Sequence, residues 1–143
     1  MKKLILALSI LVSFNSFAQD ATIINTENSY EQVGEVKWGP MYVADLTKFS
    51  NDNYTLSYQD AKFRTIENIK EVEMSSSATE TLYNTMMSVL PGSDDVTIAI
   101  GNKMLMISTF KKKKSIMITI IDEYEISSFF TLRGKDINKL FAK

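Results

Sequence analysis

The chain alternates between two patterns of apolar and polar residues. In most segments apolar residues occupy every second position, which is typical of half-buried strands, whereas in two segments they recur every three or four residues, as in amphipathic helices. The strands are expected at residues 36–46, 54–59, 66–74, 96–100, 103–110, 116–121 and 124–132, and the helices at about 77–90 and 135–141.

Turn-forming residues separate these segments. Residues 50–53 (SNDN) predict a turn, because Asn and Asp bond their own backbone and tolerate unusual dihedral angles. Residues 101–102 (Gly-Asn) indicate a two-residue hairpin, and residues 122–123 (Asp-Glu) indicate a tight turn. Pro40 cannot donate to a strand ladder, so it predicts a bulge or a sheet edge.

The longer helix is expected to begin with a capping box. Ser77 can accept a hydrogen bond from the Glu80 amide while the Glu80 side chain reaches back to the helix start. Pro91 ends the helix, because the residue before a proline is pushed out of helical dihedral angles. The apolar stripe, which is wide enough to pack on a sheet, comprises Leu82, Tyr83, Met86, Met87, Val89 and Leu90.

This order of elements favours an α+β domain. We expect one mainly antiparallel sheet of about seven strands, in the order βββ-α-ββββ-α, with the helices packed on one face. Residues 35–143 should form this single domain, preceded by a flexible polar lead at residues 19–34. Strands followed by a helix occur twice, which leaves a duplication open, but no residue-level repeat supports it.

Residues 1–18 have the three-part pattern of a secretory signal peptide. Residues 2–3 are lysines, residues 4–12 are mainly apolar, and Ser16 and Ala18 are small residues before a cleavage site. We expect cleavage after Ala18 and export to the periplasm or the cell exterior. The apolar run is shorter than the ~20 residues of a membrane span, and no later segment is long and apolar enough to span a bilayer.

Charge and composition narrow the classes of partner. Without Lys2 and Lys3, the 16 basic residues fall to 14, against 17 acidic residues. A dedicated nucleic-acid-binding protein usually has a strong basic excess, so we expect no nucleic-acid partner.

The residue content of the sequence also excludes several kinds of catalytic and metal-binding site. The sequence has no His and no Cys, so a Ser-His-Asp triad, His-ligated zinc and thiol catalysis are excluded. Neither a glycine-rich phosphate loop nor the ligand spacing of a calcium loop is present. We therefore expect no enzyme activity, cofactor or metal. The pairs Glu71 with Glu73 and Glu123 with Glu125 leave a carboxylate-dependent hydrolase as a weaker alternative.

A run of four lysines separates two strongly apolar strands. The run comprises Lys111, Lys112, Lys113 and Lys114. We favour a solvated turn that keeps the flanking strands soluble, and the alternative is a patch for an anion, a membrane surface or an acidic partner. A meander would place Asp94 and Asp95 at the lysine end of the sheet, and Lys103 near residues 122–123.

Aromatic and methionine side chains supply further candidates. Trp38, Tyr42, Tyr54 and Tyr58 form a candidate aromatic surface for a peptide or sugar, with core packing as the alternative. A methionine group is expected to fill gaps in the core, with an adaptable interface as the alternative. This group comprises Met86, Met87, Met104, Met106 and Met117.

These features favour a small exported binding protein whose partner is a protein, a peptide or an envelope component. Its candidate surface is the helix-free sheet face, which should carry Thr97, Thr119, Ser127 and Thr131. The alternative is a structural or envelope-stress accessory protein without a discrete ligand site.

Overall fold

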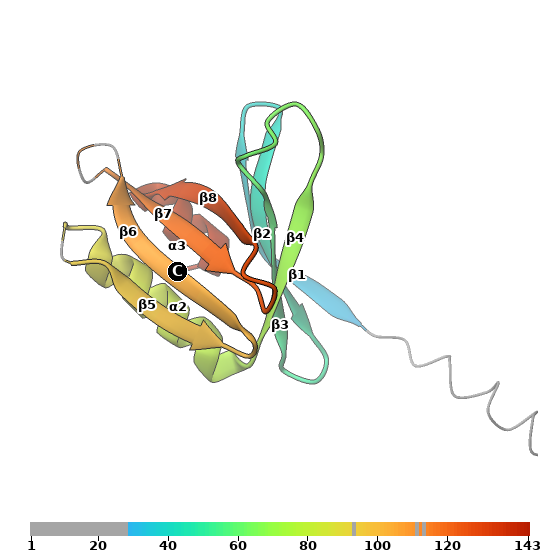
Figure 1. Cartoon of the computed structure of the whole chain (residues 1–143). Coiled ribbons are helices and arrows are strands. Elements are labelled where there is room, and N and C mark those ends of the chain that lie inside the picture. The colour runs from blue at the N-terminus through green and yellow to red at the C-terminus, as the bar shows by residue number, and fades with distance from the viewer. Residues whose placement is uncertain (1–28, 93, 111, 113) are drawn as a thin grey trace, which may run out of the picture.

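The structure, a computed structural model, describes residues 29–92, 94–110, 112 and 114–143. The expected signal peptide at residues 1–18 lies outside this part. The elements follow the order ββββ-α-ββββ-α (Figure 1). The first half contains β1 (Tyr30–Trp38), β2 (Met41–Phe49), β3 (Tyr54–Gln59), β4 (Ile69–Met74) and α2 (Ser76–Val89). The second half contains β5 (Val96–Ile100), β6 (Lys103–Phe110), β7 (Ser115–Ile121), β8 (Ser127–Arg133) and α3 (Gly134–Phe141).

The strands form two separate four-stranded sheets, one from β1 to β4 and the other from β5 to β8. Neighbouring strands are antiparallel throughout both sheets, so the predicted α+β class with mainly antiparallel pairing is confirmed. The expected single sheet of about seven strands is wrong. Figure 1 shows the two sheets at a steep angle. The meander breaks after β4 because α2 follows directly and carries the chain away to β5.

β1 is the strand that the sequence pattern did not reveal. It begins at Tyr30, inside the expected flexible lead, because its polar residues are held by pairing with β2 rather than by alternating burial. The Tyr30 ring lies 6.5 Å from the ring of Phe49 on β2. Pro40 lies in the turn between β1 and β2, not in a bulge or at a sheet edge. The expected strand at residues 36–46 is therefore a hairpin.

Two other strand boundaries differ from expectation. β4 begins at Ile69 rather than at residue 66, because a loop precedes it. β8 begins at Ser127 rather than at residue 124, because the turn after β7 is wider than two residues. In that turn the Asp122 carboxylate accepts hydrogen bonds from the backbone N–H groups of Tyr124 and Ile126, at 3.0 and 2.9 Å. The expected turns at residues 50–53 and 101–102 are confirmed.

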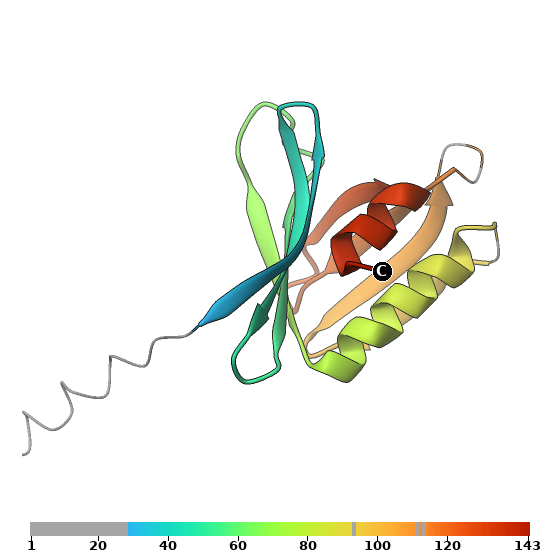
Figure 2. The ribbon, with the colours of Figure 1, turned by 180° about the vertical axis from the view of Figure 1, so that it is seen from behind.

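Both helices lie on the same face of the second sheet (Figure 2). The N-cap of α2 is Ser75, whose side chain accepts from the Ala78 N–H at 3.2 Å, so the expected capping box at Ser77 is wrong by two residues. The helix ends at Val89, as the following proline predicts. Its buried stripe includes Leu82 and Met86, both fully inaccessible to solvent.

One hydrophobic core joins the two sheets and the helices. The second sheet contributes its helix-facing residues, including Leu105 and Ile118, and the first sheet contributes residues such as Leu56. At the junction, the Tyr58 ring stacks on the Phe130 ring at 4.8 Å between centroids. The Tyr58 hydroxyl also shares a hydrogen bond of 2.7 Å with the Ser128 hydroxyl. The sheets are therefore locked together by packing and by a buried polar contact.

α3 packs closely on β1 as well as on the second sheet. A Cβ atom at Gly34 would lie only 2.2 Å from the Lys139 carbonyl oxygen and 2.4 Å from the Leu140 carbonyl oxygen. Glycine is thus required at this crossing because the backbones approach too closely for any side chain. The contact fixes α3 across the open side of β1.

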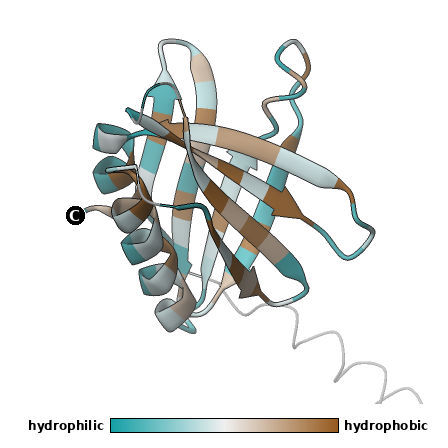
Figure 3. Ribbon diagram, turned by 60° about the vertical axis from the view of Figure 1, so that its left-hand side comes forward, coloured by the Kyte–Doolittle hydropathy of each residue, from teal (hydrophilic) through white to brown (hydrophobic). Residues whose placement is uncertain are grey.

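The face of the second sheet that points away from the helices carries many apolar side chains. Because residues paired across strands share a face, Met106 lies with Thr97, Thr119 and Phe129 on this open face. Figure 3 shows hydrophobic residues running along the strands of this sheet. Within the described residues, no helix is both long enough and apolar enough to cross a membrane.

Candidate functional site: an aromatic groove between the sheets

Compared with three other cavities lined by described residues, the one between the two sheets has the most apolar lining, and its volume is about 640 Å³. Four segments of the chain line it: the β1–β2 hairpin, the loop between β3 and β4, the end of β6 and the middle of β8. We call this cavity the aromatic groove. Its principal apolar side chains are Trp38, Met41, Ile66, Phe110 and Phe129.

The hairpin side of the groove is held by Asp136 at the start of α3. The Asp136 carboxylate accepts a hydrogen bond from the Trp38 indole N–H at 3.0 Å and one from the Arg133 Nε at 2.7 Å. The Arg133 guanidinium also lies over the Trp38 ring, 5.1 Å from its centroid. Burial alone would raise the pKa of Asp136, but the hydrogen bonds from Arg133 and Trp38 outweigh it and lower that pKa. The carboxylate is therefore charged and fixes the orientation of Trp38.

The loop between β3 and β4 is shaped by one glutamine. The Gln59 side-chain amide donates to the carbonyl oxygens of Phe63 and Ile66, both at 3.0 Å, and its oxygen accepts from the Asn68 N–H at 3.1 Å. These bonds replace the strand ladder that the loop cannot form with its neighbours. The loop is thereby held in one compact conformation that presents Ile66 to the groove.

The same loop is tied to the edge of β8. The Ala61 N–H donates to the Phe129 carbonyl at 2.8 Å, and the buried Asp60 carboxylate accepts from the Phe129 N–H at 3.4 Å. The Lys62 ammonium donates to the Ser127 carbonyl and, at 3.0 Å, to the Ser127 hydroxyl. The groove wall is consequently built into the fold by contacts within the chain itself.

Exposed large hydrophobic residues gather around this groove. Ile66 is 66% exposed, Met41 43% and Phe110 37%, and all three line it. Phe63 and Ile69, which are 43% and 44% exposed, belong to the same loop and to the strand that follows it. Single exposed apolar residues are common on protein surfaces, whereas a cluster of exposed apolar residues is typical of interaction sites.

The rim of the groove carries positive charge. Arg64 is exposed on the loop wall, and the lysine turn follows Phe110 directly. Lys112 and Lys114 are exposed, whereas Lys111 and Lys113 lie outside the described residues. Among the ion pairs of the described part of the chain, none involves Arg64, Lys112 or Lys114. The acidic residues on the groove wall are Glu67, which is exposed, and Asp60, which is buried.

Lys103 lies beside residue 122, as expected, because Met104 pairs with Ile121, but its ammonium group bonds to a different segment. Its ammonium donates to the Glu71 carbonyl at 2.8 Å, because the hairpin tip leans toward the edge of β4. The side-chain amide of Asn102 donates to the Glu123 carboxylate at 2.9 Å. The two turns at this end of the sheet do meet, but through an amide rather than an ammonium group.

The four predicted aromatic residues do not form one surface. Trp38 and Tyr42 both line the groove, but Tyr42 pairs with Lys37, so its side chain leaves the other face of the β1–β2 hairpin and its hydroxyl donates to the Ser57 carbonyl at 3.1 Å. Tyr58 is 2% exposed and belongs to the core, and Tyr54 lines a different cavity. The sequence could not distinguish the buried aromatic residue from the exposed ones, because all four lie on strands. Alternation alone does not say which face of a strand another sheet covers.

The helix-free face has the expected polar residues and an unexpected apolar content. Thr97, Thr119, Ser127 and Thr131 do lie on one face of the second sheet, as their strand pairing shows. Their neighbours on that face include Met104, Met106, Met117, Ile121 and Phe129. Met86, by contrast, is fully buried. This face leads into the groove through Phe129 and Thr131, both of which line it.

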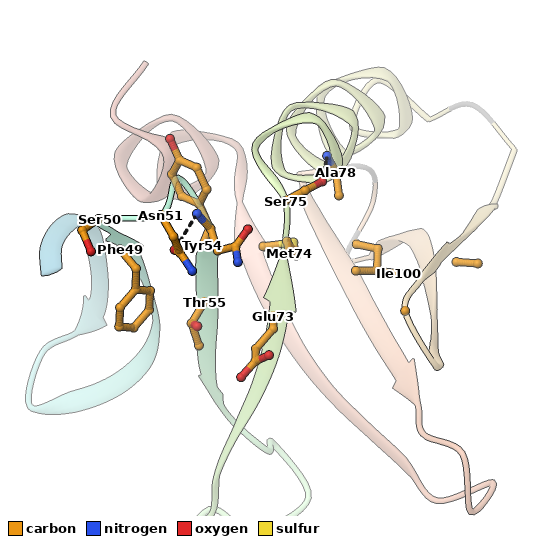
Figure 4. Close-up of a pocket in the computed structure, with 13 residues that line it drawn as sticks. Phe49, Ser50, Asn51, Tyr54, Thr55, Glu73, Met74, Ser75, Ala78 and Ile100 are labelled. Carbon is orange, nitrogen blue, oxygen red and sulfur yellow. Dashed lines mark hydrogen bonds between the residues drawn. The ribbon is translucent and has the colours of Figure 1, made fainter. Parts of the chain in front are cut away.

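A second cavity, of about 580 Å³, lies on the opposite side near the start of α2 (Figure 4). Its lining mixes polar with apolar side chains. Asn51 accepts from the Asn53 N–H at 3.1 Å, and Ser75 is already used as the helix cap. The charged residue on its wall is Glu73. With few apolar anchors and its capping hydroxyl occupied, this cavity is a weaker candidate than the groove.

Carboxylates gather on the outer face of the first sheet rather than in a cleft. Glu35, Asp45, Ser57 and Glu71 lie in one row across its four strands. The pKa of Asp45 is raised, mainly by burial and also by the nearby charges of Glu35 and Glu71. Hydrogen bonds to its carboxylate lower the pKa but do not cancel this rise. In the described residues no group of three or more potential metal-ligating side chains could hold a metal ion.

Comparisons with protein-family models, with curated proteins and with solved structures gave no match.

Proposed function

We propose that this chain is a small exported, non-enzymatic binding protein and that the aromatic groove receives its partner. One observation carries this proposal: three separate segments bring exposed apolar side chains around a single cavity of about 640 Å³. Preformed apolar cavities of this size, with a few fixed polar groups, are typical of binding sites. Export rests on the pattern of residues 1–18.

The construction of the groove also supports a binding role. Gln59, Asp60 and Asp136 use their side chains to hold the groove walls, and none of the three belongs to the hydrophobic core cluster. An accessory protein without a ligand site has no need to hold Ile66 more than half exposed on a fixed loop. Rigid presentation of apolar side chains lowers the entropic cost of binding.

A pull-down from native envelope extract tests this proposal with one groove variant and one matched control. Ile66→Glu places a charge on the groove wall, and Ile126→Glu makes the same change in the turn before β8. Both isoleucines lie mainly in solvent, with exposures of 66% and 55%, so both variants should fold. We expect the wild type and Ile126→Glu to retain one stoichiometric partner and Ile66→Glu to lose it.

Two results would count against the proposal. Equal recovery of the partner by all three proteins would place binding elsewhere on the surface. A blank with folded wild type, under several extraction conditions, would favour the accessory-protein alternative.

A further inference from the structure

We infer that the groove binds an extended peptide segment of a partner protein, which adds a short strand to the edge of β8 at Thr131. The apolar side chains of the peptide would enter the groove, and its acidic residues would face the cationic rim. This inference rests on the proposed function, because it names the class of ligand that the same groove takes.

The first support is an unused hydrogen-bonding position on β8, the last strand of the second sheet. The backbone N–H and C=O of Phe129 point away from β7, because they bond to Asp60 and Ala61. In a strand every second residue points the same way, so the N–H and C=O of Thr131 also face outward. The Arg133 N–H is occupied by a carboxylate at 3.1 Å. In the described part of the chain no hydrogen bond engages the outward backbone groups of Thr131.

The second support is the position of that edge. Thr131 lines the groove together with Trp38 and Phe129. An incoming strand would exchange a pair of hydrogen bonds with Thr131 and place alternate side chains among the groove aromatics. Loop residues 60–62 already bond to β8 at Ser127 and Phe129. The edge of β8 is therefore covered at one end, whereas its hydrogen-bonding groups at Thr131 face the groove.

The third support is the charge around the groove. Arg64 stands on the loop wall, and Lys112 and Lys114 stand beyond Phe110 at the other end. None of these three cations has an ion-pair partner in the described residues, although the whole chain is slightly acidic. A peptide with acidic residues on either side of an apolar centre matches this distribution. Such complementarity speeds association and excludes wrong partners.

An array of end-capped seven-residue peptides tests the inference. Glutamates occupy the flanking positions, and the three central positions are varied over apolar residues. The best binder is then titrated into the protein while the fluorescence of Trp38 is followed. This residue is the sole tryptophan of the sequence and lies in the groove, so its emission reports occupancy directly.

Backbone pairing is tested from both sides of the contact. Thr131→Pro removes the outward N–H, a change that an edge strand tolerates because that group has no ladder partner. Thr131→Ala, which keeps the N–H, is the matched control. N-methylation of the central peptide nitrogen removes the complementary donor from the ligand and needs no change in the protein. We expect the proline variant and the N-methylated peptide each to bind about three- to tenfold more weakly, and the alanine variant to bind like wild type.

Charge is tested with Lys112→Gln/Lys114→Gln and with Lys135→Gln/Lys139→Gln as the control on α3, whose two lysines are also exposed. We expect only the first pair to weaken peptide binding, and the loss to shrink as salt is raised.

Laurate, an apolar anion without a peptide backbone, separates this inference from the proposed function. Quenching of Trp38 by laurate with no binder in the peptide array would keep the groove as a ligand site and overturn the peptide inference. A peptide that binds equally well after N-methylation, and equally well to Thr131→Pro, would overturn it too. If the proline variant fails to fold, the N-methylated peptide alone decides the outcome.

Discussion

Replacement of Gly34 by alanine tests the contact between β1 and α3. The new Cβ atom would lie 2.2 and 2.4 Å from the carbonyl oxygens of Lys139 and Leu140. Ordinary carbon–oxygen contacts exceed 3 Å, so the helix must move away by about 1 Å. The obstructing atoms are backbone, which prevents the local relief that a flexible side chain provides.

The cost follows from what α3 buries. Ile137 and Leu140 are fully buried and Phe141 is 6% exposed. Full burial of such side chains contributes about 1.5–3 kcal/mol each, and a gap of 0.5–1 Å forfeits about a quarter to a half of the contact energy. For the three side chains together the loss is therefore about 1–4.5 kcal/mol, offset by about 0.4–1 kcal/mol from the lower entropy of the unfolded chain. We expect a net loss of about 2 kcal/mol, the middle of the resulting range.

Urea denaturation followed by far-ultraviolet circular dichroism measures this loss, with Gly134→Ala as the control. A Cβ atom at Gly134 meets only the flexible end of the Leu90 side chain, at 2.9 Å, and alanine suits the first turn of a helix better than glycine. The control should be neutral or stabilising. A Gly34→Ala protein as stable as wild type would refute the reasoning, because α3 would then not be held against β1 by this close approach.

Two further predictions concern carboxyl groups. Asp136→Asn should reduce stability at neutral pH and red-shift Trp38 emission. The pKa of Asp136 is lowered from its ordinary 3.8, so its contribution to the free energy of unfolding is fully present above that value. This contribution disappears as pH falls through the folded-state pKa, and the stabilities of the wild type and the variant should converge there. Asp45→Asn should instead stabilise the protein at neutral pH, because its raised pKa shows that the folded state disfavours the charge. That gain should vanish below pH 3.8, and a constant gain across the titration would contradict it.

Much of the second half of the fold can be predicted from the sequence. The bounds of β6 match expectation, and β5, β7 and α3 lie within one residue of it, because buried aliphatic residues alternate without interruption between clear turns. The first half is harder to predict. β1 has few buried residues, and its pairing with β2 includes two register shifts, so no simple period marks it.

The groove is less predictable than the strands. The sequence singles out Trp38 and Tyr42 as candidates, and the structure places both in it. Ile66 and Phe129 carry no distinguishing local signal, because their importance depends on two sheets meeting at a steep angle. The amide of Gln59, which bonds three separate loop positions, could have been noticed only as a polar residue at the end of a strand.

The two halves of the chain each supply a helix that serves the other. α2 belongs to the first half but rests on β5 and β6, whereas α3 belongs to the second half and contacts β1 more than any other element. Each meander therefore depends on its counterpart for cover. A cut between the two halves would leave each sheet without the helix that the other half supplies. We therefore expect the protein to unfold as one cooperative unit.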